Sequence, residues 1–435
     1  MQMDHFVIGL DIGSHYIKAS ALSTTDETFM VSALVESQGM DKNEIVDVKA
    51  LGSAVKKVIQ KLEVKISRSI TSVFLCVQPE HLKFYETSGH AELFGDAVTQ
   101  RELDIAMDSA QKVSIGDENE IVDMLISKYY VDETIYGNPL GVRGSNFDFS
   151  GQLATAPKAY IEKLYDALAL AKIKIAGTGL STVGAGSILL SRGDWQKGAV
   201  IVDSGAHTTR AVYVKNHKVV DVSSVQLGGK NITRDLAIVL KISLLEAEEL
   251  KKSYARGALA KEDDDYQMIE DIIKARIEEI MGFVEKFVMK HQETGDVRKL
   301  VVYGGGLCGF NSINKMYKSA LNLSTNFITS DIIRDDSVLT IQSSGLAYHL
   351  LSAIHCKGAI DEMIRQEERQ LEEVSTAASD EDFFKKYQMK FGEENVDMKN
   401  MNSDDEDEYL DDYEDSSIFQ RIRDWFVSLK NKIKK

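Results

Sequence analysis

The sequence predicts an α/β protein made of two related halves, with a small α+β region inserted into the first half. Three observations support this prediction. A strand–turn–strand segment occurs twice, at residues 7–22 and 199–214, and the two copies align without a gap. Strand and helix patterns follow each copy in a similar order. Between the copies, residues 83–157 change to a pattern of strands with one helix.

The two aligned turns carry the same kinds of side chain. The matched pairs are Asp11 with Asp203, Gly13 with Gly205, His15 with His207, and Lys18 with Arg210. Tight turns with glycine expose backbone N–H groups that can bind phosphate, and a carboxylate at a strand end can hold the water shell of Mg²⁺. Two such turns facing each other would form a clamp for one polyphosphate.

Size and charge limit the classes of function. A chain of 435 residues is too long for one ordinary domain, and its 43% hydrophobic residues are enough for real cores. The net charge of -17 disfavours nucleic acid as a partner, because phosphate backbones require a basic surface. We find no apolar run long enough to cross a bilayer and no basic-plus-apolar leader. We therefore expect a protein made in the cytosol that does not span a membrane.

The first half begins with the first copy of the repeat. Its further elements are expected as a strand at 28–35, a helix at 49–62, a strand at 72–77, and helices at 158–172 and 180–190. Three strands, a helix and a strand are the start of a ribonuclease-H-like unit. We assign this half to residues 1–82 and 158–195.

The inserted region occupies residues 83–157. Its one helix is expected at Thr99–Lys112, where Thr99 is a suitable N-cap and Glu102 can complete a capping box. Glycine- and proline-containing turns at 137–144 separate its strands. We interpret this region as a small α+β subdomain.

The second half is assigned to residues 196–360, with a helical subdomain at about 229–295. Its elements after the repeat are expected as a strand at 219–227, helices at 232–240, 244–254 and 266–291, a strand at 299–303, and a helix at 343–354. The 299–303 strand ends in three glycines, Gly304, Gly305 and Gly306, which permit a close approach of backbone to a ligand.

The C-terminal part has two sections of opposite charge. Residues 361–415 lack a sustained apolar period and become densely acidic, so we predict a disordered acidic linker. Residues 416–435 predict a basic amphipathic helix that binds an anionic membrane surface. Its apolar face contains Ile418, Phe419, Ile422, Trp425, Phe426, Leu429 and Ile433. The alternative is a helix that docks on the protein's own core, but a long acidic tether does not suit docking.

These features converge on a nucleotide site between the two halves. Phosphate contacts are expected from Gly13, Ser14, His15, Lys18, Gly205, Ala206, His207 and Thr208. Asp11 and Asp203 are placed to bridge Mg²⁺ and its waters to the phosphate oxygens. The three glycines would approach an adenosine, and Glu248 and Lys251 would contact its ribose or base. No catalytic residue is identified, since His15 and His207 are interpreted as residues that fill glycine positions in the turns.

The order of these elements resembles the actin/Hsp70/sugar-kinase superfamily, and the chain is similar to the FtsA family of actin-like bacterial cell-division proteins. The similarity covers residues 4–356 and the C-terminal helix. The more specific stretches are Asn43–Val48, Val98–Leu103, Asn138–Gly144 and Ala247–Lys251. The resemblance implies an actin-like fold of two ribonuclease-H-like halves, with an SHS2-type subdomain at residues 83–157.

The resemblance also implies a function. It implies that ATP with Mg²⁺ binds between the halves and that the protein assembles into filaments on the cytoplasmic face of the membrane at the division site. It further implies that the helical subdomain binds the C-terminal tail of FtsZ, with Arg276 as the candidate contact, and so tethers the Z ring. The inserted subdomain would bind other proteins of the divisome.

The second turn departs from the usual family pattern Asp-Ile-Gly-Gly-Gly-Thr-Thr-Asp. Ala206 and His207 replace two glycines, and Arg210 replaces the final acid. We therefore expect a nucleotide-binding protein with at most weak ATPase activity. The alternatives are a pilus-assembly or rod-shape protein of the actin superfamily, or a metabolic kinase. A rod-shape relative would not carry the inserted region, and a kinase needs a carboxylate base that the sequence does not identify.

Overall fold

The computed structural model describes residues 5–24, 30–78, 82–259, 265–293, 297–310, 323–328 and 340–352, together with residues 313, 317, 364, 365 and 369. The predicted acidic linker at 361–415 lies outside the described residues apart from three positions. The predicted amphipathic helix at 416–435 lies wholly outside them. Among the helices that the structure does describe, none combines the length and apolar character needed to cross a membrane.

The first half is built on a five-stranded sheet with the order β11-β6-β1-β2-β3. Its strands are β1 (Phe6–Ile12), β2 (Tyr16–Ser23), β3 (Met30–Glu36), β6 (Ser72–Val77) and β11 (Lys174–Leu180). The first three form an antiparallel meander, and β6 and β11 add in parallel beside β1. The carboxyl ends of β1 and β6 therefore meet at one edge of the sheet.

The second half repeats this topology with the order β14-β13-β12-β15-β16. Its strands are β12 (Ala199–Ser204), β13 (Thr209–Lys215), β14 (Lys218–Val225), β15 (Lys299–Tyr303) and β16 (Ser324–Phe327). Again three antiparallel strands are followed by two parallel ones. The internal repeat of the sequence is thus a repeat of the fold.

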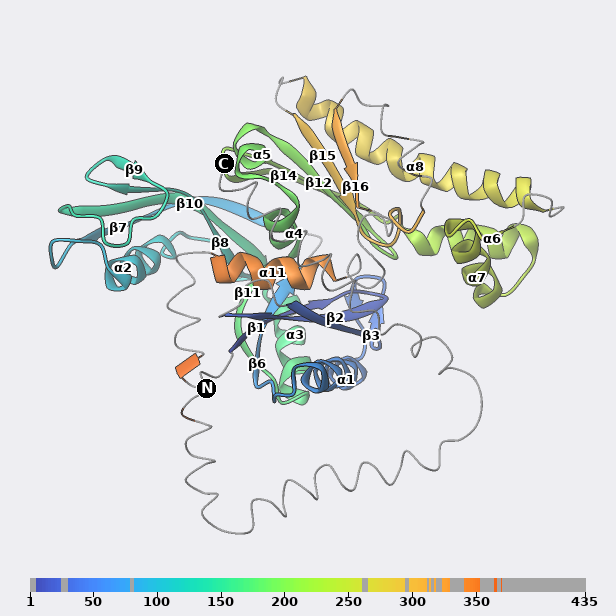
Figure 1. The fold of residues 1–435 in the computed structure, drawn as a ribbon, viewed down its shortest axis with the longest axis horizontal. Helices are drawn as coiled ribbons and strands as arrows, with labels where there is room; N and C mark the ends of the chain where they lie inside the picture. Colours follow the sequence, from blue (N-terminus) through green and yellow to red (C-terminus); the bar gives the residue numbers. More distant parts are fainter. Residues whose placement is uncertain are drawn as a thin grey trace, which may run out of the picture.

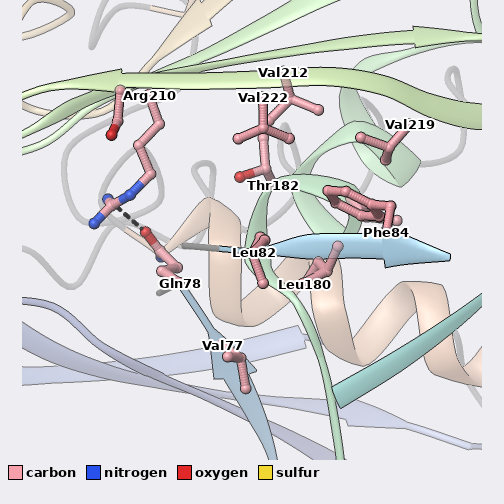
Figure 2. A pocket seen from close by; sticks show the side chains of 12 residues that line it. Val77, Gln78, Leu82, Phe84, Leu180, Thr182, Arg210, Val212, Val219 and Val222 are labelled. Atoms are coloured by element: carbon pink, nitrogen blue, oxygen red, sulfur yellow. Dashed lines mark hydrogen bonds between the residues drawn. The ribbon is translucent and has the colours of Figure 1, made fainter. Parts of the chain in front are cut away.

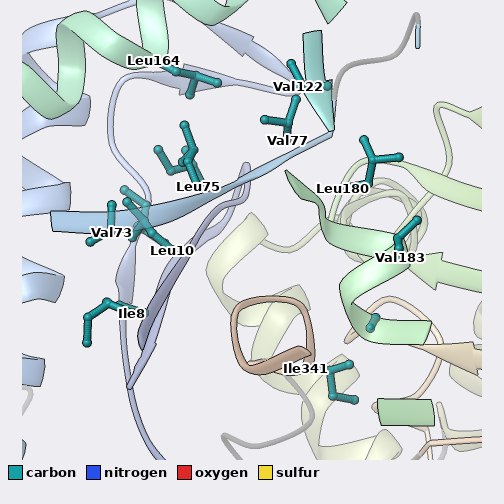
Figure 3. Packing of buried hydrophobic residues seen from close by; sticks show 14 of the residues in the cluster. Ile8, Leu10, Val73, Leu75, Val77, Val122, Leu164, Leu180, Val183 and Ile341 are labelled. Carbon is teal, nitrogen blue, oxygen red and sulfur yellow. The ribbon is translucent and has the colours of Figure 1, made fainter. Parts of the chain in front are cut away.

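Helices pack on both sides of each sheet. Helices α1 (Val48–Ile66) and α3 (Lys158–Leu170) cover one face of the first sheet. Figure 3 shows Leu10 of β1, Leu75 of β6 and Leu164 of α3 within this core. Helices α6 (Gly229–Leu240), α7 (Leu244–Ala255) and α8 (Tyr266–Gln292) lie on the outer side of the second half (Figure 1).

Two helices lie between the sheets. Helix α4 (Ser181–Leu189) follows β11, and α11 (Ile341–Ser352) crosses it while resting on β1, β2 and β6 (Figure 1). Gly184 and Gly345 meet at the crossing, where a Cβ on Gly345 would lie only 2.4 Å from the Gly184 carbonyl oxygen. The absence of side chains at these two positions allows the halves to approach closely.

The inserted subdomain is a four-stranded antiparallel sheet with the order β7-β10-β8-β9. Its elements are β7 (Lys83–Glu92), α2 (Gln100–Ala110), β8 (Asn119–Val131), β9 (Thr134–Tyr136) and β10 (Asn146–Pro157). Thr99 caps α2, and its backbone N–H donates to the Glu102 carboxylate over 2.9 Å, so the predicted capping box is present. The subdomain extends to one side of the molecule (Figure 1).

Most predicted elements agree with the structure to within a few residues. Helix α6 begins at Gly229 rather than at 232, because the Gly228 N–H donates to the side chain of Asn231 and starts the first turn earlier. Short elements were missed, among them β4 (Met40–Asp41), β5 (Glu44–Ile45) and α5 (Arg192–Lys197). These segments are too short to show a period in the sequence.

Candidate functional site

The two repeated turns have the same backbone geometry. In the first, the Gly13 N–H donates to the Tyr16 carbonyl over 3.1 Å, and in the second the Gly205 N–H donates to the Thr208 carbonyl over 2.9 Å. In both hairpins the acid faces the base across the two strands, Asp11 opposite Lys18 and Asp203 opposite Arg210. The alignment of the two copies is therefore an alignment in space as well.

The two turns face each other and touch. Ser14 Oγ lies 3.0 Å from Nδ1 of His207, and the side-chain amide of Asn43 donates to Thr208 Oγ1 over 2.6 Å. Neither Ala206 nor His207 has a positive φ, so these two replacements of glycine cause no backbone strain. The structure thus brings together the residues predicted for phosphate binding, in an arrangement where the two turns are in direct contact.

Two buried ion pairs lie beneath the turns. Lys18 Nζ lies 2.8 Å from Asp11 Oδ2, and Arg210 Nη1 lies 3.8 Å from Asp203 Oδ2. Burial favours the neutral acid and raises the pKa of Asp203, although Arg210 and Lys18 oppose this shift. Each half thus brings one carboxylate and one cation to the same place.

Gln78 joins the two ion pairs from the end of β6. Its Nε2 donates to Asp11 Oδ1 over 2.9 Å, and its Oε1 accepts from Arg210 Nη1 over 2.8 Å. Figure 2 shows the Arg210 side chain reaching from the second sheet toward Gln78. A single amide thereby connects the carboxylate of the first half with the cation of the second.

Gln342 at the start of α11 makes the reciprocal connection. It donates to Asp203 Oδ2 over 2.9 Å and accepts from Lys18 Nζ over 3.3 Å. The cleft-base network, as we name it, therefore consists of Asp11, Lys18, Gln78, Asp203, Arg210 and Gln342. It links the two halves by hydrogen bonds in both directions.

The predicted glycine strand end packs on the second turn. Gly304 has a φ of 95°, and Cβ atoms on Gly304 and Gly306 would lie 2.5 and 2.4 Å from the carbonyl oxygens of Ser204 and Gly205. The close approach that these two glycines permit is therefore to the protein's own backbone. Gly305 is the exposed member of the three. Their contact with an adenosine stays a prediction.

The residues predicted for the nucleoside lie beside these glycines. Lys251 Nζ donates to the Gly229 carbonyl over 3.1 Å, to Thr233 Oγ1 over 2.9 Å and to Glu248 Oε2 over 2.9 Å. Burial alone would raise the pKa of Glu248, but the attraction of Lys251 and the hydrogen bond from Thr233 outweigh it and lower the pKa to about 2. The same burial lowers the pKa of Lys251. Helices α6 and α7 thus hold a charged pair at the second turn.

Several basic side chains lie near the two turns. The pKa of His15 is lowered to about 4, first by burial and then by the charges of Lys230 and Lys251, which outweigh the opposite effect of Glu248. The pKa of His207 is lowered by burial and then by Lys230 and Arg234. Both histidines are therefore neutral at pH 7 in a site surrounded by lysine and arginine. Such a site favours an anionic ligand.

Mg²⁺ requires several oxygen ligands with surplus negative charge. Three of the four carboxylate oxygens of Asp11 and Asp203 already accept hydrogen bonds from the chain's own donors, and the fourth, Asp203 Oδ1, is buried against Gly304. Lys18 and Arg210 balance the two negative charges. No group of three or more metal-ligating side chains occurs within the described ranges. The residues present do not fit an ion held by the protein.

A small apolar cavity lies beside Arg210, between the two halves and the inserted subdomain. Val77, Leu82, Phe84 and Val222 are among the residues that line it, and Gln78 and Arg210 form its polar end (Figure 2). Its lining is mostly apolar and offers few hydrogen-bond partners. It therefore does not suit a nucleotide.

Sequence reasoning missed Gln78, Gln342 and Asn43 as site residues. The position of Gln78 held a usable signal, because it directly follows β6, and side chains at the carboxyl ends of adjacent parallel strands meet at one edge. Gln342 carried no such signal, since its place depends on how α11 enters the cleft. For Arg210, the sequence showed the replacement of an acid but not the contact with Gln78 of the other half.

Arg276 lies on α8 and is not part of the cleft-base network. Its Nε and Nη2 donate to the two oxygens of Asp235 on α6, over 2.7 and 3.0 Å, and Nη1 contacts Glu279. The guanidinium is partly exposed but engaged by two acids. The sequence did not predict these partners.

Comparison with known families identifies the chain. A family model described as "Cell division protein FtsA" matches residues 200–381, and one described as "SHS2 domain inserted in FTSA" matches residues 80–155. The second model describes a subdomain by its insertion into that one family. The chain belongs to the FtsA family. This membership confirms the predicted resemblance and decides against a metabolic kinase or a pilus or rod-shape protein.

Curated relatives agree with this assignment, and solved structures share the fold. FtsA of Bacillus subtilis is 26% identical over 66% of this chain and 70% of the relative. FtsA of Streptococcus pneumoniae is 26% identical over 72% of each. Among solved structures, the PilM–PilN type IV pilus biogenesis complex has a TM-score of 0.54 at 15% identity, covering 79% of this chain and 97% of the other. EutJ of Carboxydothermus hydrogenoformans has a TM-score of 0.50 at 14% identity, covering 79% and 89%.

These likenesses and the two matching sheets confirm the predicted fold. It is an actin-like fold of two ribonuclease-H-like halves with an SHS2 subdomain in the first. The family implies interaction with the division machinery.

Proposed function

We propose that this FtsA-family protein binds ATP between its halves, assembles into filaments on the cytoplasmic face of the membrane and tethers FtsZ filaments there, helping to form the Z ring. The observation that supports it most strongly is the pair of matched turns, which face each other with basic side chains around them. Two glycine-containing turns with cations around them suit the phosphates of one nucleotide.

The nucleotide would lie across the second turn. Its phosphates would accept from the amides of both turns and from Lys18, which requires the Ser14–His207 contact to open. Its nucleoside would lie toward Glu248 and Lys251, where Gly305 is exposed. Helix α4 offers no acid or glutamine to orient a water, and Gln78 and Gln342 are both engaged by the two ion pairs, so nucleotide would be held rather than turned over rapidly.

The ion expected with ATP would remain on the nucleotide. Mg²⁺ commonly keeps several waters and binds substrate phosphates more than protein groups. Asp11 and Asp203 are engaged by Lys18 and Arg210, so we assign the ion to the phosphate oxygens alone.

Membrane binding is assigned to residues 416–435. Seven large apolar side chains on one face, surrounded by basic residues, suit a helix that lies in an anionic surface. Residues 361–415 would then act as the tether between this helix and the folded part. Other divisome proteins would bind the inserted subdomain.

FtsZ binding is assigned to the helical subdomain, with Arg276 as the contact for the FtsZ tail. The Arg276 side chain is 24% exposed and belongs to α8, a helix on the outer side of the second half (Figure 1). A tail carboxylate would have to compete with Asp235 for the same donors.

Co-sedimentation with anionic liposomes tests the tethering function. We expect FtsZ to pellet with the liposomes only when the full chain and ATP are present. Arg276→Glu should abolish recruitment of FtsZ while the chain itself still pellets. Lys274→Glu, a charge reversal two residues away on the same helix, should leave recruitment intact. Equal FtsZ pelleting with wild type and Arg276→Glu would remove Arg276 from the interface.

Filament formation is tested by electron microscopy on lipid monolayers. Filaments are expected on lipid with ATP and not without it. Filaments that form equally without nucleotide would contradict nucleotide-dependent assembly.

A further inference from the structure

The cleft-base network contains equal numbers of acids and bases in a nearly closed place. The side chains of Asp11 and Asp203 are 1% and 3% exposed, and those of Lys18 and Arg210 are 12% and 13% exposed. With both acids ionised, the two negative charges meet two positive charges. A buried group of this kind has no surplus charge with which to attract a divalent ion.

Arg210 supplies the second positive charge that balances the two carboxylates. It faces Asp203 across the second hairpin, at the position where Lys18 faces Asp11 in the first. Its stem passes along the wall of the apolar cavity, and its head is directed to Gln78 of the other half (Figure 2). The guanidinium is therefore fixed from both halves and is not a free surface charge.

One donor of this guanidinium is unused. Within the described part of the chain, Arg210 Nε and Asp203 Oδ1 are buried atoms without a hydrogen-bond partner. An unpaired buried donor on a cation is costly unless a ligand or water satisfies it. A phosphate oxygen is the acceptor that a guanidinium prefers.

We propose that Arg210 supplies the positive charge that a divalent cation would otherwise bring to the nucleotide phosphates, so that this protein binds ATP with little dependence on Mg²⁺. The proposal rests on the proposed nucleotide binding and specifies its chemistry. Arg210 and Lys18 neutralise phosphate charge from the two halves. Gln78 and Gln342 hold these two cations in place by accepting a hydrogen bond from each.

The test measures binding of ATP to the full chain by calorimetry, in excess MgCl₂ and in excess EDTA. We expect the two dissociation constants to agree within about threefold, less than the tenfold that corresponds to 1.4 kcal/mol. A loss of more than about tenfold in EDTA would overturn the proposal while leaving ATP binding itself supported. Absence of ATP binding in both buffers would overturn this proposal and the proposed function together.

Two variants separate Arg210 from Lys18. Arg210→Asp restores an acid beside Asp203 and should make binding depend on Mg²⁺ by about tenfold or more, as expected for a charge-assisted contact. Arg210→Lys keeps the charge and should stay independent of Mg²⁺. If Arg210→Asp loses stability, its melting temperature should rise on addition of MgCl₂ alone, whereas that of wild type should not. An Arg210→Asp variant as indifferent to Mg²⁺ as wild type, in both binding and melting, would refute the assignment.

Discussion

Replacing Gly345 with alanine tests the packing that holds the two halves together. Gly345 lies in α11 where this helix crosses α4, and an added Cβ would lie 2.4 Å from the oxygen and 2.6 Å from the carbon of Gly184. Both are backbone atoms, which cannot rotate away. To restore an ordinary contact of 3.4 Å, α11 would have to move by about 1 Å from α4, since 3.4 minus 2.4 is 1.0.

The expected magnitude is the difference between two opposing effects. Alanine is favoured over glycine in a helix interior by about 1 kcal/mol. Overpacking of a well-packed site costs about 1–3 kcal/mol, and the upper end applies where only backbone can yield. We expect Gly345→Ala to destabilise the protein by about 2 kcal/mol. The same change at Gly282 of α8, which has no neighbouring atom within 4 Å of the added Cβ, should stabilise by up to about 1 kcal/mol.

Thermal melting of the two variants provides the assay. A change of 1 kcal/mol moves the midpoint by about 2–4 °C for a domain of 150–250 residues, so the two variants should separate by several degrees. The displaced α11 also carries Gln342, so ATP affinity should fall for Gly345→Ala and not for Gly282→Ala. A Gly345→Ala protein that melts at or above the Gly282→Ala temperature would refute the reasoning about this crossing.

Three further predictions concern charge and membrane binding. The pKa of His15 is about 4 in the folded protein against 6.5 in the unfolded chain, so its contribution to stability is complete above pH 6.5 and is lost as the pH falls toward 4, by up to about 1.4 kcal/mol per pH unit. His15→Gln should therefore weaken the fall in melting temperature between pH 7 and pH 5. An unchanged dependence of melting temperature on pH would contradict this. Glu248→Gln should lower stability at pH 7 by about 1–3 kcal/mol, because Lys251 stays buried without its charge partner, and a melting temperature equal to that of wild type would show that the pair contributes nothing. Trp425→Glu should abolish sedimentation with anionic liposomes, because burial of a large apolar side chain contributes about 1.5–3 kcal/mol. Retained sedimentation with unchanged melting would place the membrane contact elsewhere.

Much of the fold could be predicted because its information is local. The strand–turn–strand pattern of residues 7–22 and 199–214 predicts two hairpins. Each hairpin is present with its acid opposite its base. Helices α1 and α8 show a clear apolar period, and the capping residues of α2 fix where it begins. Segments as short as α5 could not be predicted, because a single turn of helix carries no period.

The candidate site could be predicted only in part. Ser14 and His207 were expected on facing turns, but their direct contact depends on how closely the halves approach. The glycines at 304 and 306 were expected to allow close approach to a ligand; that contact stays a prediction, and their packing on the second turn was not foreseen. The fixed partners of Arg276 were not predictable, since Asp235 and Arg276 come from different helices.

The residue pattern along the chain is enough to show that two matched hairpins exist, that each carries one acid and one base, and that a distinct subdomain interrupts the first half. These properties follow from side-chain periodicity and from the spacing of residues along one chain. The folded arrangement was needed to see that Gln78 and Gln342 connect the two ion pairs. It was also needed to see that Arg210 lies opposite Asp203 and reaches the other half. The physical reason is that these contacts join segments whose separation depends on the packing of α4 against α11 and not on any local pattern.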